Sequence, residues 1–293
     1  MFEVGVAAAL IGLASGAVYA MVALGMSLAF RSGGLINVAQ GDLGVLCAYI
    51  GSALIAAGLP YWVALLVVSI GAALLMIGLD RMVLRRLYGC NPVYLIIITV
   101  GMSAVIEAAI TLHWGGNPLV YKPALGNGVL HVGGFSFFVR DLVALGVCLL
   151  VAGALAAGLR FTSIGRDIRA AASDPEAAEL CGVSVARARA VSLGLSGFLA
   201  GLGGMILAAL VALYPTTGLD ITLAAFVGAV IGGFGSMGGA VLGSLIVGLI
   251  NGVSATYVSS VFQSIFVYIV LGLILIVRPS GIFGEEGVGV REV

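Results

Sequence analysis

Residues 165–205 read GRDIRAAASDPEAAELCGVSVARARAVSLGLSGFLAGLGGM, a charged, helix-forming segment that runs directly into a long apolar stretch. Residues 160–189 hold five arginines, two aspartates and two glutamates, although only 9% of the 293 residues are charged and 61% are hydrophobic. Charges at this density are stable in water or against a polar partner, and are costly inside a membrane. We therefore expect the segment to lie outside the membrane and to dock another protein, rather than to be an ordinary solvated loop.

The centre of this segment has the signals of a short capped helix. Asp174 is an N-cap residue, Pro175 suits the first turn, and Glu176 is favourable at the positive end of the helix. The helix reads PEAAEL and ends at Gly182, which can supply a left-handed C-cap. Isolated helices need roughly 12 to 15 residues, so we expect packing or a partner to hold this one. On the stretch before it, three polar residues share one helical face: Arg166, Arg169 and Ser173.

The rest of the chain predicts an all-α polytopic membrane protein with about eight or nine transmembrane segments. A bilayer core of about 30 Å needs about 20 apolar residues per helix. Seven apolar runs fit: 4–30, 61–79, 93–112, 142–159, 190–213, 237–258 and 261–277. Two further stretches, near 34–58 and 221–238, are interrupted by glycines and predict broken or re-entrant helices. The first run is too long for a signal peptide and lacks a basic start, so we expect it to remain as a span.

The basic residues predict the orientation. If nine segments alternate, eleven of the thirteen basic residues fall on one side, and only Lys122 and Arg140 on the other. The positive-inside rule then places the N-terminus outside and the C-terminus in the cytoplasm. Small residues four apart predict close helix contacts, as in the pairs Gly12/Gly16, Gly197/Gly201, Gly228/Gly232, Gly239/Gly243 and Gly248/Gly252.

Several kinds of chemistry are absent from the sequence. Lys122 is the only lysine, so no phosphate-binding GxxxxGK[ST] loop exists and this chain cannot hydrolyse ATP alone. His113 and His131 lack metal-ligand spacing, and the four cysteines are scattered singly, so we expect neither a metal site nor a disulfide. Motifs for nucleophilic catalysis are missing, and a net charge of zero gives no nucleic-acid-binding face. We expect a chain that is not an enzyme and needs no cofactor of its own.

Four polar residues at membrane depth are candidates for a substrate pathway: Asn37, Gln40, Asp42 and Glu107. Ionisable groups there are costly and usually face a cavity or a partner. If residues 34–42 are helical, Asp42 lies about 12 Å into the membrane. The alternative is a structural role: Asn37, Gln40 and Asp42 could instead form hydrogen bonds with backbone groups that are freed where the helix is broken. The breaks carry few charged side chains, which suits a neutral or zwitterionic solute better than a multivalent ion.

The order of the motifs along the chain resembles the branched-chain amino acid (Liv-type) family of ABC transporter permeases. The stretch from Gly165 is similar to the family pattern GRAxRAxAxDxxAAxLxGIxxxRxxxxxFxxSGxLAGxAG. GLINVAQGDLGVLCAYIG resembles GxINFAHGExxMxGAY, VGAVIGGFGSMGGAVLGSLIVGLINGV resembles VLGGxGSxxGAxxGGxxLG, and RPSGIFG resembles RPxGLFG. The similarity covers nearly the whole chain, so it implies a single permease domain over residues 1–293.

The resemblance implies that residues 160–190, here called the coupling segment, bind an ATPase subunit. The residues expected to carry this contact are Arg166, Arg169, Asp174, Glu176, Ala177, Ala178 and Gly182. It further implies a bacterial inner-membrane importer with two ATPase subunits that bind the ATP, and a second permease chain in a heterodimer or homodimer. A periplasmic or lipid-anchored solute-binding protein would meet the outer loop 115–140 and the turn from Tyr214 to Asp220.

Two departures from the family pattern leave the solute open. Gln40 stands where the family usually has His, and Asp42 where it usually has Glu, so a titrating histidine does not carry over. Relatives of this kind move branched-chain amino acids, urea, short amides or aromatic acids. Two other classes also stay open: an ion-coupled secondary transporter that uses Asp42 and Glu107, and an inactive assembly partner.

Overall fold

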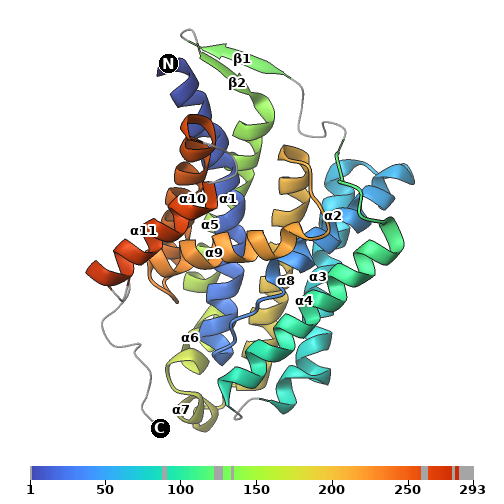
Figure 1. Cartoon of the computed structure of the whole chain (residues 1–293). Coiled ribbons are helices and arrows are strands. Elements are labelled where there is room, and N and C mark those ends of the chain that lie inside the picture. Colours follow the sequence, from blue (N-terminus) through green and yellow to red (C-terminus); the bar gives the residue numbers. More distant parts are fainter. Residues whose placement is uncertain are drawn as a thin grey trace.

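The computed structural model describes residues 2–87, 91–121, 128–132, 135–258, 263–278 and 281–283, and the part of the chain it describes is almost entirely helical (Figure 1). One of the four cysteines, Cys90, and two of the thirteen basic residues, Lys122 and Arg291, lie outside these residues. The helices are α1 (Phe2–Gly33), α2 (Gln40–Ala56), α3 (Tyr61–Met82), α4 (Pro92–Trp114), α5 (Val139–Phe161), α6 (Ser163–Ser173), α7 (Pro175–Leu180), α8 (Val185–Leu210), α9 (Thr217–Gly232), α10 (Met237–Tyr257) and α11 (Gln263–Val277), with the short 3-10 helix η1 (Leu84–Arg86).

Six described helices are long and apolar enough to cross a membrane: α1, α3, α4, α5, α8 and α10. They coincide with six of the seven predicted runs, which confirms the polytopic class. The seventh run, 261–277, contains the 15-residue described helix α11, and residues 261 and 262 lie outside the described part of the chain. Helices α2 and α9, with 17 and 16 residues, are also short.

The break near residue 34 lies between two helices. α1 ends at Gly33, Gly34 has φ +66°, and residues 34–39 are not helical. The condition on which the depth of Asp42 was estimated, a helix that starts at Gly34, is not met, because α2 begins only at Gln40. Since the first nine residues of α2 include eight that are buried, the helix starts inside the protein.

The second break lies within the predicted stretch 221–238. α9 is continuous from Thr217 to Gly232 and the interruption falls at residues 233–236, where Gly233 and Gly235 have φ +103° and +93°. These φ values suit glycine, since a Cβ is unfavourable there. Figure 1 shows α9 (orange) lying across the other helices rather than along them. Asp220 lies in the first turn of α9, so the predicted turn from Tyr214 to Asp220 is shorter than expected.

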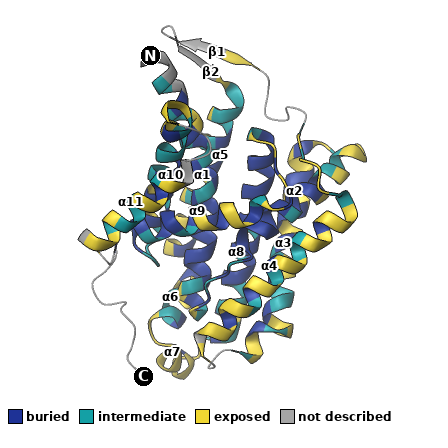
Figure 2. Cartoon of the chain, viewed as in Figure 1, coloured by how far each residue is buried: buried dark blue, intermediate teal, exposed yellow. Residues whose placement is uncertain are grey.

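The core is centred on α1 and α8, which are buried along most of their length, whereas α3, α4 and α5 expose a broad apolar face (Figure 2). Glycines permit the close packing. A Cβ on Gly12 or Gly16 would meet the backbone of α10 around Gly248, and one on Gly197 would meet the backbone of α3 at Ala72. Gly228 and Gly232 meet the first turns of α10 in the same way. All five predicted small-residue pairs therefore lie at helix contacts.

The outer loop holds a feature that the all-α prediction missed. β1 (Val129–Val132) and β2 (Phe135–Phe138) form an antiparallel hairpin. Before it, Leu119 forms a backbone bridge with Leu213, and the Tyr121 hydroxyl donates to the Ala48 carbonyl oxygen at 2.6 Å. Burial raises the pKa of the Tyr121 phenol well above its usual value, so it remains a hydrogen-bond donor at neutral pH. These contacts attach the outer loop to α2 and to the segment that follows α8.

Candidate functional site

A buried cluster of polar side chains surrounds the start of α2. Asn37 Oδ1 accepts from the Ala39 N–H at 3.2 Å, and Asn37 Nδ2 donates to Gln40 Oε1 at 3.0 Å. Gln40 Nε2 in turn donates to the Ser196 carbonyl oxygen at 2.8 Å, and Ser196 Oγ donates back to Gln40 Oε1 at 3.0 Å. Asn37 and Gln40 are 1% and 0% exposed, so their hydrogen bonds replace those that water would make. This geometry fits the structural alternative for these two residues.

Thr222 on α9 closes the same cluster from the other side. Its Oγ1 accepts from the Gly41 N–H at 2.9 Å and lies 3.1 Å and 3.0 Å from the carbonyl oxygens of Val38 and Gly218. The first N–H groups of a helix have no partner within the helix, and buried ones must find one elsewhere. Thr222 supplies that partner, so α9 holds the break between α1 and α2 in place.

Asp42 is the buried ionisable group of the cluster, at 1% exposure. Ser103 Oγ on α4 donates to Asp42 Oδ2 at 2.5 Å, and a Cβ on Gly218 would meet Asp42 Oδ1. Glu107, half-buried and one helical turn beyond Ser103, is close enough for electrostatic repulsion with Asp42. The structure therefore divides the four predicted pathway residues: Asn37 and Gln40 are bonded towards α8, whereas Asp42 faces Ser103 and Glu107 on α4.

Three members of this cluster were not predicted: Ser103, Ser196 and Thr222. The sequence feature that could have identified them is a serine or threonine within an apolar run, since such residues form hydrogen bonds between membrane helices. The sequence holds several other residues of this kind, so this signal alone does not identify the partners.

The coupling segment has the capped helix that the sequence predicts. Asp174 Oδ1 accepts from the N–H groups of Glu176 and Ala177 at 3.0 Å and 3.1 Å, with Pro175 at the first position of α7. Gly182 follows the helix with φ +83°. Because α7 has six residues, its stability must come from packing.

The packing comes from one side of α6 and α7. Arg169 Nη1 donates to the Leu159 carbonyl oxygen at the end of α5. Ala178 is buried in an apolar cluster whose other members are Leu28, Leu159, Ile168, Ala171, Val185 and Ala188. Arg169 and Ala178 therefore attach the coupling segment to the transmembrane helices. The remaining predicted residues are exposed: Arg166, Asp174, Glu176, Ala177 and Gly182.

The outward side of the segment carries large apolar side chains that the sequence reasoning did not single out as contact residues. Leu180, at the end of α7, is 91% exposed, Phe161 is 78% exposed and Ile164 is 54% exposed. Beside the segment, a cleft of about 310 Å³ lies between the end of α3 and the start of α8, with Arg81 and Arg187 in its walls. Exposed apolar side chains and arginines are both enriched in protein-binding sites.

Comparisons with known proteins agree with this architecture. The chain is similar to the high-affinity branched-chain amino acid transport system permease protein LivH of Salmonella typhimurium, with 28% identity over 94% of both chains. It is 27% identical to the corresponding protein BraD of Pseudomonas aeruginosa, over 94% of this chain and 95% of the relative. It is 25% identical to the ribose import permease protein RbsC of Haemophilus influenzae, over 85% and 77%. No solved structure shows a significant match.

The match to a protein family is continuous. The family model described as the permease component of branched-chain amino acid transport systems matches residues 8–278, which include every described transmembrane helix, the polar cluster and the coupling segment. The chain is therefore a multi-pass membrane protein that belongs to the family of permease components of branched-chain amino acid transport systems.

Proposed function

We propose that this chain is the membrane-spanning subunit of a bacterial inner-membrane ABC importer for branched-chain or related hydrophobic amino acids. The whole of residues 1–293 would form one permease domain, with the N-terminus outside and the C-terminus in the cytoplasm. Two separate ATPase subunits would bind and hydrolyse the ATP, so this chain needs no cofactor and is not itself an enzyme. Family membership and the names of LivH and BraD support the solute class.

One observation carries the coupling role: α7 is fixed to the permease on one side and presents Leu180 at 91% exposure on the other. Arg169 and Ala178 hold the segment, whereas Arg166, Glu176 and Ala177 would contact the ATPase subunit. Asp174 and Gly182 set the two ends of α7. Movement of the ATPase subunit would thus reach α5 and α8 through a short, rigidly capped element.

The polar cluster would have two roles in solute transport, one structural and one in the pathway itself. Asn37 and Gln40 would hold the break at the start of α2 and so position the residues that follow it. Asp42 and Glu107 would provide negative charge along the pathway, complementary to the ammonium group of an amino acid. This assignment places the solute between α2 and α4.

The remaining partners follow from the exposed surfaces. A second permease chain, as a heterodimer or homodimer, would cover part of the exposed apolar helix faces, and lipid would cover the rest. A solute-binding protein, periplasmic or lipid-anchored, would meet the outer loop 115–140. Fastening of this loop by Tyr121 and Leu119 supports a defined docking surface.

The test is uptake into proteoliposomes that contain this chain, its partner permease and ATPase subunits, with the binding protein outside. We expect labelled leucine or valine to enter when ATP is present inside, and an ion gradient without ATPase subunits to drive no uptake. Uptake driven by the gradient alone would indicate an ion-coupled secondary transporter. If uptake stays intact when this chain is deleted, the chain is an assembly partner. Transport of ribose, urea, short amides or aromatic acids would change the assigned solute but not the importer function.

A further inference from the structure

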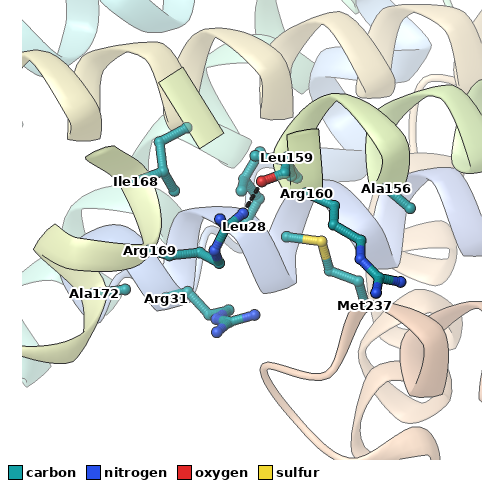
Figure 3. A pocket seen from close by; sticks show the side chains of 9 residues that line it. All are labelled: Leu28, Arg31, Ala156, Leu159, Arg160, Ile168, Arg169, Ala172 and Met237. Atoms are coloured by element: carbon teal, nitrogen blue, oxygen red, sulfur yellow. Dashed lines mark hydrogen bonds between the residues drawn. The ribbon is translucent and has the colours of Figure 1, made fainter. Parts of the chain in front are cut away.

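A cavity of about 190 Å³ opens at the end of the molecule where α1 and α5 finish. Figure 3 shows that its walls come from α1, α5, α6 and the first residue of α10. Its lining combines six apolar residues with three arginines, namely Leu28, Ala156, Leu159, Ile168, Ala172 and Met237 with Arg31, Arg160 and Arg169. The cavity is therefore amphipathic, with no acidic residue in its lining.

The positive charge of this cavity is not neutralised by the described residues. Across the ranges that the structure covers, Arg31 and Arg160 make no ion pair and no hydrogen bond, and the Arg160 guanidinium lies 5.6 Å from the centroid of the Phe161 ring. Arg169 donates to the Leu159 carbonyl oxygen, which fixes its guanidinium at the wall (Figure 3). Three cations around one opening repel each other, so an anion between them lowers the free energy.

The arginines lie at the depth of lipid headgroups. α5 has 23 residues and is about 34 Å long, slightly more than the hydrocarbon core of about 30 Å, and Arg160 is its last residue but one. Arg31 lies in the last turn of α1, at the same end of the molecule (Figure 1). Basic pockets between transmembrane helices at this level are suited to phospholipid headgroups.

An apolar track leads along α5 to the cavity. Leu149, Gly153, Ala156 and Arg160 follow one another at helical spacing and all four are exposed. A free phosphate ion would use only the arginines, whereas a phospholipid would place its phosphate among the arginines and an acyl chain along this track. We propose that the cavity binds the headgroup of an anionic phospholipid such as phosphatidylglycerol.

Such a lipid would also touch the coupling segment. Arg169 and Ile168 belong to α6, while Arg31 and Arg160 belong to transmembrane helices. The bound phosphate would therefore join α6 to α1 and α5 by charge-assisted hydrogen bonds. This lipid site does not depend on the identity of the solute.

Native mass spectrometry of the complex, purified in detergent, tests the proposal. The measured quantity is the number of phosphatidylglycerol molecules retained, compared with phosphatidylcholine at the same concentration. The double variant Arg31→Gln/Arg160→Gln should bind phosphatidylglycerol about tenfold more weakly. Arg86→Gln is the matched control, because Arg86 is an exposed arginine at the same end that lines neither cavity, and it should bind as the wild type does.

A second pair of variants tests the site without removing charge. Ala156→Trp should fill the cavity and lower phosphatidylglycerol retention, whereas Trp at the neighbouring exposed Ala157, outside the lining, should not. Retention that survives both Ala156→Trp and the double arginine variant would overturn the proposal. So would displacement of the lipid by equimolar inorganic phosphate, which would indicate a free-anion site.

Two other occupants would also give distinct results. If the permease without ATPase subunits prefers phosphatidylglycerol and the full complex does not, the arginines bind the ATPase subunit, and the lipid proposal is wrong. If the preference appears only after Glu285→Gln and Glu286→Gln, the acidic C-terminal residues of this chain occupy the cavity, which also contradicts it. None of these measurements depends on uptake, so failure here leaves the proposed transport function untouched.

Discussion

Gln40 and Ser196 exchange two hydrogen bonds between α2 and α8, at 2.8 Å and 3.0 Å, although 156 residues separate them in the sequence. Both residues are fully buried. The two hydrogen bonds attach Gln40, the first residue of α2, to α8, the most buried helix of the core. The position of Asp42, two residues further along α2, depends on this attachment.

Replacing Gln40 with Ala should destabilise the protein by about 1–3 kcal/mol, because it leaves the Ser196 hydroxyl and Asn37 Nδ2 buried without their partner. The measurement is the thermal unfolding midpoint of the purified chain in detergent. A midpoint equal to that of the wild type would contradict the structural role assigned to Gln40.

Gly204 on α8 should tolerate no side chain. A Cβ there would collide with the backbone of Gly44 on α2, whereas one on the neighbouring Gly203 would meet Val22 at 3.5 Å, an ordinary contact. Gly204→Ala should therefore cost about 1–3 kcal/mol or more, and Gly203→Ala should cost little. Equal yields and unfolding midpoints for the two variants would show that α2 and α8 are not packed this closely.

The sequence predicted the helix contacts better than the polar contacts, for a physical reason. Close helix packing needs small residues at fixed spacing on one helix, so Gly12/Gly16 is visible locally. A hydrogen bond such as that from Ser103 to Asp42 joins two helices, and nothing local in either helix records the partner. The outer hairpin was missed because its strands are four residues long and follow a glycine-rich loop.

Asp42→Asn should lower uptake several-fold while expression and unfolding stay near those of the wild type. The amide can still accept a hydrogen bond from Ser103, but the negative charge along the pathway is lost. Uptake that is unchanged by Asp42→Asn would remove Asp42 from the pathway.

Gly182→Val should separate ATP hydrolysis from uptake. A β-branched residue at φ +83° costs about 1–2 kcal/mol and distorts the end of α7. We expect the reconstituted complex to hydrolyse ATP while labelled solute no longer enters. Gly71→Val, at an exposed position with open space around it, should keep both activities. Coupled uptake in the Gly182 variant would disprove the role of this turn.

The coupling segment illustrates which part of a site a sequence can predict. Asp174, Pro175 and Gly182 form caps, which depend on neighbouring residues and were predicted. The direction in which Arg169 and Leu180 point depends on how the segment packs against α5 and α8, so the sequence did not show that one faces inward and the other outward.

The most direct test of the account is the ratio of solute molecules taken up to ATP hydrolysed in proteoliposomes that contain Leu180→Asp. Because Leu180 is 91% exposed, the change should leave the unfolding midpoint of the isolated chain unaltered. We expect the ratio to fall about tenfold or more, since a charge replaces an apolar contact with the ATPase subunit, and Leu180→Met to preserve it. A normal ratio in Leu180→Asp would contradict the claim that α7 transmits the action of the ATPase.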